Sequence, residues 1–436
     1  MSIDYTTFNS QSMLDYSSID DDLDAVCFLK DSSNFRPFSQ GLKEIIIKKG
    51  FKGNPDDNNE TSGYLISKLR EINSDIKNET VYSWFSGKHR PKIEAGSRMR
   101  IYEICFALNL SFEETVWFFN HVYFDRCFNC HNIEEAVFYY SFLHGTQYQE
   151  AVNIINTINN APFKEETLID ETVHNYTQFI RDRISGFNSV NELQEFLIDN
   201  KANFNCWNNS ALAAIKKMLL EITGDESSKA IVDNLKRNLT RKMNSNKELK
   251  KLDEINISET DIDKCGLLIK EILMDAKTSN VSASEYILEA ISGKNILKNT
   301  FVLDRLLSTI TGIPKNINIP YVIKNNFPSK KILSDVLDES KVTVSKSYDS
   351  IRKTIVLLDF YVFWVRIKLG ITDISSYSTE DLFAIYRDEA DTLLYECGYE
   401  PLYAGNPYDW IFLCSAKNED SLTFFRRCID GLLSDD

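Results

Sequence analysis

Apolar residues recur every three or four positions along most of this 436-residue chain, and this spacing marks one face of an α-helix. Near the start of the pattern, Leu42, Ile45 and Ile46 share such a face, and Gly50 follows as a helix stop. Four later segments have the same period, at 189–200, 208–222, 228–243 and 259–276. The sequence therefore predicts an all-α protein.

Five short helices are predicted between residues 38 and 119. The residues at 54–63 are expected to form a loop between the first two helices, because Asn, Asp and Gly dominate this stretch. Ser97 is expected to open the fourth helix. Ser111 and Glu114 form a capping box, which predicts the start of the fifth helix.

The third of these helices, at 78–86, leads into a short basic turn. Asn78 is its expected N-cap, and Gly87 is its expected stop. The face predicted to lie in the core consists of Val81, Trp84 and Phe85. The outward face is predicted to hold Glu79, Thr80, Tyr82, Ser83 and Ser86. The candidate ligands on this face and in the turn are Thr80, Tyr82, Ser83, Lys88, His89, Arg90 and Lys92. Such side chains can bind the phosphates or bases of a nucleic acid.

Charge is distributed unevenly along the chain, whose formal net charge is −15. Residues 1–35 hold seven aspartates and one lysine, whereas residues 36–100 carry a net charge of +5. So acidic a protein is not expected to coat nucleic acid with its whole surface, but one basic face can still bind it. The segment 236–251 also leans basic, and a solvated helix and loop is the preferred interpretation there.

Neither a membrane span nor a signal peptide is predicted. The longest apolar stretch, 354–367, is interrupted by Asp359 and Arg366. The first residues lack the basic and apolar regions of a secretory signal. Nine scattered cysteines fit reduced thiols better than a disulfide framework, so a cytoplasmic location is expected.

A weak internal repeat links two distant parts of the chain. A shift of 275 residues places 114–140 on 389–415, with Glu134 opposite Asp409. Each copy is predicted to form a helix, an aromatic turn and a second helix. The identity between the copies is low, so chance similarity is the alternative.

The stretch around the basic turn resembles the helix-turn-helix domains of phage repressors (Xre/Cro-type). The residues that carry the resemblance are Val81, Trp84, Gly87, Lys88, Pro91 and the phrase "FALNLSFEE" at 106–114. It extends over about residues 38–119. The resemblance implies a five-helix DNA-binding domain whose helix 78–86 enters the major groove.

The resemblance also assigns roles to the polar residues of this helix and turn. Thr80, Tyr82 and Ser83 would face the bases. The side chains that would hold phosphates are Lys88, His89, Arg90 and Lys92. The helix has no Arg, Asn or Gln after Asn78, so it lacks a bidentate reader of bases. The loop at 52–62 is also longer than is usual in such domains.

Composition and this resemblance together divide the chain into four parts. Three prolines in the extended sequence at 311–328 mark the clearest boundary. The predicted parts are an acidic flexible arm at 1–35, a helix-turn-helix domain with a helical extension at 36–160, a helical middle domain at 161–312 and a C-terminal helical module at 313–436.

The C-terminal phrase "TLLYECGYEPLY" resembles a segment that follows the helix-turn-helix in bacterial regulators of the same type. Together with 329–364, it suggests a second, degenerate helix-turn-helix. The basic face of that motif would be Lys346, Arg352 and Lys353. The alternative is that the aromatic helix in this region is buried against the repeat.

Little in the sequence points to catalysis or to a cofactor. "CFNCH" at 127–131 has the spacing of covalent haem attachment, but a packed turn is the preferred interpretation, with no metal or cofactor. No phosphate-binding glycine loop and no nucleophile elbow is present. The sequence therefore predicts a protein that is not an enzyme.

The leading hypothesis is a bacterial or mobile-element DNA-binding regulator of transcription, in which the other helices serve dimerisation or a protein partner. The acidic arm could cover the basic turn as a mimic of DNA. The alternative is a helical adaptor that keeps the fold without binding DNA. Its partner-binding aromatic residues would be Phe118, Phe119, Tyr139, Tyr140, Phe360, Tyr361 and Trp364.

Overall fold

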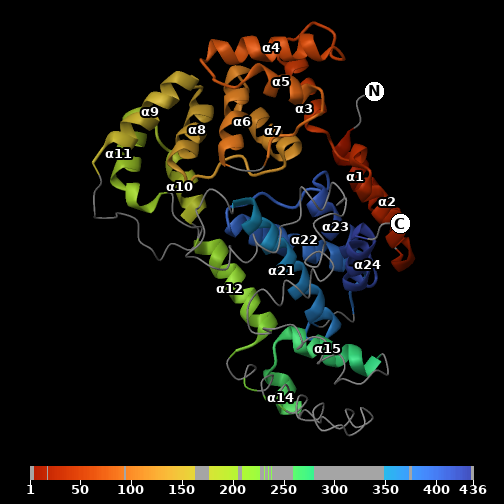
Figure 1. Ribbon diagram of the computed structural model, residues 1–436. Coiled ribbons are helices and arrows are strands. Elements are labelled where there is room, and N and C mark those ends of the chain that lie inside the picture. Colours follow the sequence, from red (N-terminus) through yellow and green to blue (C-terminus); the bar gives the residue numbers. More distant parts are fainter. Residues whose placement is uncertain are drawn as a thin grey trace.

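The protein is all-α wherever its structure is described. The computed structural model describes residues 4–16, 18–92, 95–162, 176–204, 209–225, 259–278, 348–372 and 376–433, together with the single positions 230, 234 and 237. Every regular element within these ranges is helical, which confirms the predicted all-α class. Figure 1 shows that the helices form an upper and a lower group.

The upper group is built around one hydrophobic core, which we call the N-terminal core. Its buried side chains extend from Phe38 to Phe204. Its helices are α3 (Phe38–Lys48), α4 (Asn58–Glu71), α5 (Asn78–Phe85), α6 (Ala95–Ala107), α7 (Phe112–Phe118), α8 (Ile133–His144), α9 (Tyr148–Asn160), α10 (Tyr176–Ser185) and α11 (Val190–Asp199). A π-helical segment, η3 (Phe119–Tyr123), continues α7, and the short turn η4 (Lys201–Asn203) follows α11.

The lower group encloses a second core, the C-terminal core, which the two ends of the chain build together. Its later elements are α12 (Asn209–Thr223), α14 (Glu259–Lys264), α15 (Leu267–Thr278), α21 (Tyr348–Lys368), α22 (Thr379–Glu396), α23 (Pro407–Ala416) and α24 (Ser421–Leu433). The N-terminal elements are α1 (Tyr5–Ser12), η1 (Ile19–Asp21), α2 (Asp22–Lys30) and η2 (Ser32–Asn34). Figure 1 shows α2 beside α24, and these two helices pack together.

The prediction of a flexible arm at 1–35 is wrong for residues 4–16 and 18–35. The ring of Phe28 stacks on Trp410 with 4.8 Å between the ring centroids, and Leu29 is fully buried. Ser18 and Asp21 form a capping box before α2. The aspartates that suggested disorder are close in sequence to the apolar residues with which α2 packs into the core. Because this segment packs against α24 and Trp410, it does not cover the basic turn at 87–92.

The predicted middle domain is divided between the two cores. Helices α10 and α11 pack against α8 and α9, whereas α12 and α15 pack against α21. The helix predicted at 259–276 is broken into α14 and α15 at Cys265 and Gly266. The predicted boundary at 311–328 lies outside the described residues, as do nearly all residues of the segments 228–243 and 236–251.

The aromatic residues expected to recruit partners are mostly core residues. Phe118 and Phe119 are fully buried, and Phe360 and Tyr361 are each 1% exposed. Tyr140 and Trp364 are buried as well, while Tyr139 packs against the N-terminal core. Helices α12, α15, α22, α23 and α24 all pack against α21, so burial replaces the proposed aromatic surface on that helix.

Asp359 in α21 gives the C-terminal core a dependence on pH. Burial, and to a smaller extent Glu389, raise the pKa of this carboxyl to about 7, while Arg366 opposes them. The buried hydroxyl of Tyr386 lies nearby, and Asp359 Oδ2 has no hydrogen-bond partner among the described residues. Since the unfolded chain releases this proton at lower pH, the carboxyl costs stability progressively from about pH 4 to pH 7.

We therefore expect Asp359→Asn to flatten the decline in stability between about pH 4 and pH 7. The variant should gain about 2 kcal/mol over the wild type at pH 8, because the neutral amide avoids the cost of burying a charged carboxylate. Partial screening by solvent keeps the gain below the full cost of that burial. Urea unfolding at pH 4, 6 and 8 measures this gain. Glu389→Gln, on the exposed side of α22, is the control and should gain less. Equal stability of wild type and Asp359→Asn at pH 8 would contradict the assignment.

Candidate nucleic-acid interface

Helices α4 and α5 pack against each other and are joined by the turn at 72–77. The side chain of Asp57 caps α4 by accepting a hydrogen bond from the backbone N–H of Asn59 at 2.8 Å. This cap starts the helix at Asn58, so the predicted loop at 54–63 is wrong in its second half. Helix α5 buries Val81, Trp84 and Phe85, as predicted, although Lys77 rather than Asn78 occupies its N-cap position.

Arg70 fixes the turn between the two helices, and sequence reasoning missed it. Its Nη2 atom donates to the carbonyl oxygen of Ile76 at 2.7 Å and to Asn78 Oδ1 at 2.9 Å. Its Nη1 atom donates to the carbonyl oxygen of Ser74. One guanidinium thus holds three groups across the turn, and Asn73 adopts a left-handed conformation with φ of 57°. These contacts set the angle at which α5 leaves the turn.

Five of the seven predicted site residues gather around one open groove of about 610 Å³ between α4 and α5. Tyr82 is 38% exposed, and Ser83 Oγ donates back to the carbonyl oxygen of Thr80 at 2.7 Å. Lys88 and His89 are exposed. The groove is lined by Ser62, Ile66, Asn78, Glu79, Thr80, Tyr82, Ser83, Lys88 and His89.

Arg90 and Lys92 do not line the groove. Arg90 Nη2 donates to the carbonyl oxygen of Tyr123 at 2.7 Å, and its guanidinium lies 4.6 Å from the centroid of the Phe124 ring. The hydroxyl of Tyr123 donates in turn to the carbonyl oxygen of Lys92 at 2.5 Å, while the Lys92 side chain is exposed. Arg90 therefore anchors the basic turn to the end of η3, a role that the sequence did not predict for it.

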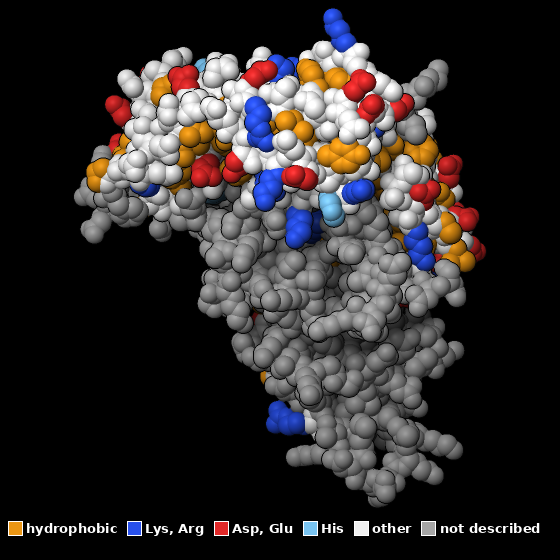
Figure 2. Space-filling model, turned by 45° about the horizontal axis from the view of Figure 1, so that its top comes forward, with side chains coloured by type: hydrophobic (Ala, Val, Ile, Leu, Met, Phe, Trp, Pro, Cys, Tyr) orange, Lys and Arg blue, Asp and Glu red, His pale blue; other side chains and the backbone are white. Residues whose placement is uncertain are grey.

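The surface around the groove carries charges of both signs. Figure 2 shows Lys and Arg side chains among Asp, Glu and hydrophobic side chains rather than in one basic field. Glu79 lines the groove beside Lys88, and Lys68 on α4 pairs with Glu71 at 2.8 Å. Gly87 takes a φ of 71°, which lets the chain turn sharply after α5, as predicted.

The residues predicted to form the basic face of a second helix-turn-helix do not form an exposed basic surface where the structure describes them. Both guanidinium ends of Arg352 donate to Asp409 at 2.8 Å, and Nη2 also approaches the carbonyl oxygens of Glu400 and Pro401. Lys353 is buried, and its Nζ atom lies 5.7 Å from the centroid of the Tyr408 ring. The third residue, Lys346, lies outside the described residues. The contacts of Arg352 and the burial of Lys353 agree with the alternative interpretation, in which the aromatic helix α21 is buried.

An equivalent arginine holds the turn before α8. Arg98 donates to Glu135 through Nε at 3.0 Å and through Nη2 at 2.6 Å, and Nη1 donates to Asp125. Nη1 and Nη2 also reach the carbonyl oxygens of Arg126 and Cys127 at 2.9 and 3.2 Å. Arg98 is 3% exposed, so this ion-pair network is shielded from solvent. Sequence reasoning had no signal for it, because its members are far apart along the chain.

The two arginine-held turns share features at corresponding positions of the predicted repeat. Asn132 caps α8 and Asn406 caps α23. Three residues later, Glu135 and Asp409 accept hydrogen bonds from the backbone N–H groups of Asn129 and Tyr403, at 2.7 and 3.0 Å. The left-handed residues Phe124 and Gly398 also correspond. Each of these pairs is separated by 274 residues, so the predicted shift of 275 is wrong by one and pairs Asp409 with Glu135.

The "CFNCH" turn is packed rather than exposed. Burial raises the pKa of the Cys127 and Cys130 thiols, and burial together with two nearby arginines lowers the pKa of His131 to about 3. All three side chains are buried and neutral at pH 7. Within the described ranges, no group of three or more His, Cys, Asp and Glu side chains is arranged to hold a metal ion.

No protein-family model matches this chain, and no curated protein or solved structure is similar to it at a significant level. Among the helices of the described residues, none combines the length and apolar composition needed to cross a bilayer.

Proposed function

We propose that this chain is a non-enzymatic DNA-binding regulator of the repressor type, which presents α5 and the following turn to the DNA. The observation that carries the proposal is the groove at the α4–α5 pair. Thr80, Tyr82 and Ser83 from α5 meet Lys88 and His89 from the turn around this one groove. In such an arrangement the second helix enters the major groove, and side chains at its end contact phosphates.

The chemistry of the groove favours binding to the DNA backbone over reading of bases. Helix α5 contributes the hydroxyls of Thr80, Tyr82 and Ser83 to the groove beside Glu79, and Lys88 is the one lysine in the lining. No arginine, asparagine or glutamine follows Asn78 within the helix to form a bidentate pair with a base. We expect weak, salt-dependent affinity with little preference for sequence.

The acidic remainder of the protein suits a chain that binds DNA through a single site. With a net charge of −15, the remaining surface repels DNA and restricts contact to the groove. A dimer would double the contact, and the helices outside the α4–α5 pair would serve dimerisation or a protein partner. In a bacterial cell, a cytoplasmic location would give this chain access to DNA.

We expect Lys88→Glu combined with His89→Glu to abolish retention of the protein on nonspecific DNA at low salt. Both side chains are exposed, so unfolding by urea should be unchanged. Affinity should fall with rising salt concentration, and the slope of log affinity against log salt should be steeper by about 1 in the wild type than in Lys88→Ala. The measurement is DNA-affinity chromatography or fluorescence anisotropy at 50 to 200 mM salt, a range in which such contacts weaken strongly.

Lys217→Glu, on the exposed face of α12, is the matched control for charge and should retain DNA binding. Arg90→Glu is unsuitable as a test, because it would also break the contacts with Tyr123 and Phe124. If the double variant and the wild type bind DNA equally, or if the wild type binds none at 50 mM salt, the proposal is wrong.

A further inference from the structure

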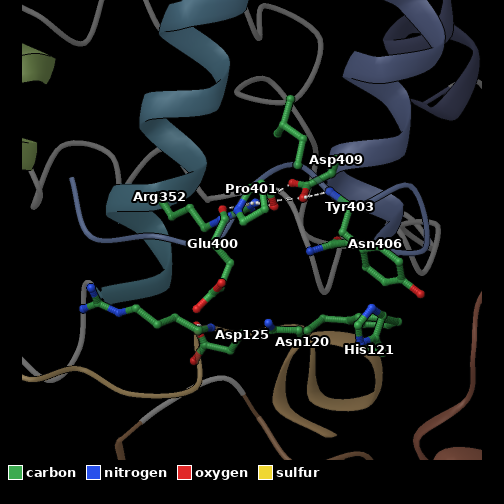
Figure 3. Close-up of a pocket in the computed structure, with 12 residues that line it drawn as sticks. Asn120, His121, Asp125, Arg352, Glu400, Pro401, Tyr403, Asn406 and Asp409 are labelled. Atoms are coloured by element: carbon green, nitrogen blue, oxygen red, sulfur yellow. Dashed lines mark hydrogen bonds and ion pairs between the residues drawn. The ribbon is translucent and has the colours of Figure 1, made fainter. Parts of the chain in front are cut away.

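A cavity of about 180 Å³ lies where the two arginine-held turns meet, between the N-terminal and C-terminal cores. Figure 3 shows side chains from both turns pointing into it. Asn120, His121 and Phe124 come from η3 and the residue that follows it, and Glu400, Tyr403 and Asn406 come from the segment before α23. A cavity of this size accommodates a molecule of about six heavy atoms, since one of about 150 Å³ holds benzene.

Most charges that line this cavity are already paired. Asp409 is bound by Arg352, and Asp125 is bound by Arg98. Arg126 also lines the cavity, but its guanidinium donates to the carbonyl oxygen of Gly398 and lies 4.7 Å from the centroid of the Tyr399 ring.

Glu400 keeps a carboxylate available to the cavity. Among the described residues, its charged partner is Arg181, whose Nη2 atom is 3.9 Å away and therefore beyond hydrogen-bond distance. The carboxylate side chain is 31% exposed and points into the space between the turns (Figure 3). A cation that enters the cavity therefore finds one carboxylate that no hydrogen bond from a described residue saturates.

The uncharged side chains that line the cavity include three polar groups, Asn406, Asn120 and His121. Asn406 Oδ1 accepts from the backbone N–H of Tyr408 at 3.0 Å, which leaves its Nδ2 to donate to a ligand. The amide of Asn120 points into the cavity beside Glu400 (Figure 3). Burial lowers the pKa of His121, so its ring is neutral, and Nδ1 lies 3.2 Å from the carbonyl oxygen of Trp117. Nε2 is then an acceptor for a hydroxyl group.

We propose that this cavity binds a small primary amine that also carries hydroxyl groups. The ammonium would donate to the Glu400 carboxylate, whereas the hydroxyls would bind Asn406, Asn120 and His121. The rings of Tyr403 and Phe124 would cover the aliphatic carbons.

A ligand in this cavity would also affect the position of the proposed DNA-binding turn. This part of the inference rests on the proposed function. Phe124 lines the cavity on one side and supports the Arg90 guanidinium on the other. Arg90 in turn anchors the turn that carries Lys88 and His89. A ligand that shifts Phe124 would therefore change how the turn meets DNA.

The test uses 2-amino-1,3-propanediol as the probe, with glycerol as its neutral counterpart in which a hydroxyl replaces the amino group. Isothermal titration calorimetry and thermal unfolding of the full chain, without DNA, should show binding of the amine. Glycerol should bind at least about tenfold more weakly, because it lacks the charge-assisted hydrogen bond. Glu400→Gln should weaken binding of the amine by about tenfold to a hundredfold.

Glu419→Gln, an exposed change after α23, is the matched control and should bind the amine like the wild type. Equal binding of amine and glycerol, no binding of either, or unchanged binding in Glu400→Gln would overturn the site. DNA retention is then measured with and without the amine, in the wild type and in Glu400→Gln. Amine binding without any DNA binding would refute the proposed function alone, whereas DNA binding without amine binding would refute this site alone.

Discussion

Arg98→Ala is expected to lower the free energy of unfolding by about 3–5 kcal/mol, the typical cost of breaking a buried ion pair from one side. The substitution removes the guanidinium that pairs with the buried Glu135 and Asp125, although Tyr102 and the backbone N–H of Asn129 would still donate to Glu135. It also removes one donor each from the carbonyl oxygens of Arg126 and Cys127, although the Tyr102 hydroxyl still donates to the second. The turn before α8 should therefore loosen as well as lose stability.

The pH dependence of Arg98→Ala separates this mechanism from a simple loss of packing. Without the guanidinium, burial would raise the pKa of the two carboxyl groups in the folded state. The folded variant would then bind more protons than the unfolded chain, so its stability should rise as the pH falls from 7 to 5. Urea unfolding at these two values measures the difference. A deficit that is the same at pH 5 and pH 7 would favour packing alone.

Arg352→Ala provides an internal comparison, because it removes the equivalent side chain from the second turn. Arg352 is 11% exposed and forms its ion pair with Asp409, which also accepts from the backbone N–H of Tyr403. We expect a smaller loss than for Arg98→Ala, about 2 kcal/mol. A larger loss for Arg352→Ala would contradict the ranking by burial and charge.

Trp410→Ala is expected to cost about 3–5 kcal/mol and to release the N-terminal helices from the C-terminal core. Trp410 is fully buried and stacks on Phe28, and its Nε1 atom donates to the carbonyl oxygen of Asn9 at 3.1 Å and to Ser12 Oγ at 3.2 Å. The side chain thus joins α1, α2 and α23. A cavity at this position removes the contact that orders the acidic N-terminal segment.

Limited proteolysis followed by mass spectrometry distinguishes release of the N-terminal segment from general destabilisation. In Trp410→Ala, the earliest cleavages should fall within residues 4–35, before global unfolding. Trp410→Phe keeps an aromatic ring but loses the Nε1 hydrogen bonds, so it should cost about 1 kcal/mol and keep the segment protected. Trp117→Ala, at a half-buried position in α7, is a further control. Early cleavage elsewhere in Trp410→Ala would show that α1 and α2 do not depend on this side chain.

Local patterns predicted much of the N-terminal core. Val81, Trp84 and Phe85 share the buried face of α5, and Gly87 ends the helix in a left-handed conformation. The capping box of Ser111 and Glu114 starts α7 as expected. Such features depend on residues within one or two helical turns, so the spacing along the chain is sufficient to predict them.

Predictions failed where a charged side chain was taken to indicate an exposed or disordered segment. Arg90 and Arg352 look like surface residues in the sequence, yet one anchors a turn and the other neutralises a buried carboxylate. The aspartates at 20–24 suggested an arm, but Phe28 and Leu29 a few residues later are buried. An arginine can satisfy five N–H donors inside a protein, and only its partners, which are far away in sequence, decide whether it does.

The sequence by itself determined that the chain is helical, where several helices begin and end, and which side of α5 faces inward. Each of these follows from short-range periodicity and capping. The tertiary structure alone decided that the two ends of the chain share one core, that the repeat aligns at 274 residues, and that five of the seven predicted site residues share a groove. Those outcomes depend on contacts between distant segments, which no local pattern encodes.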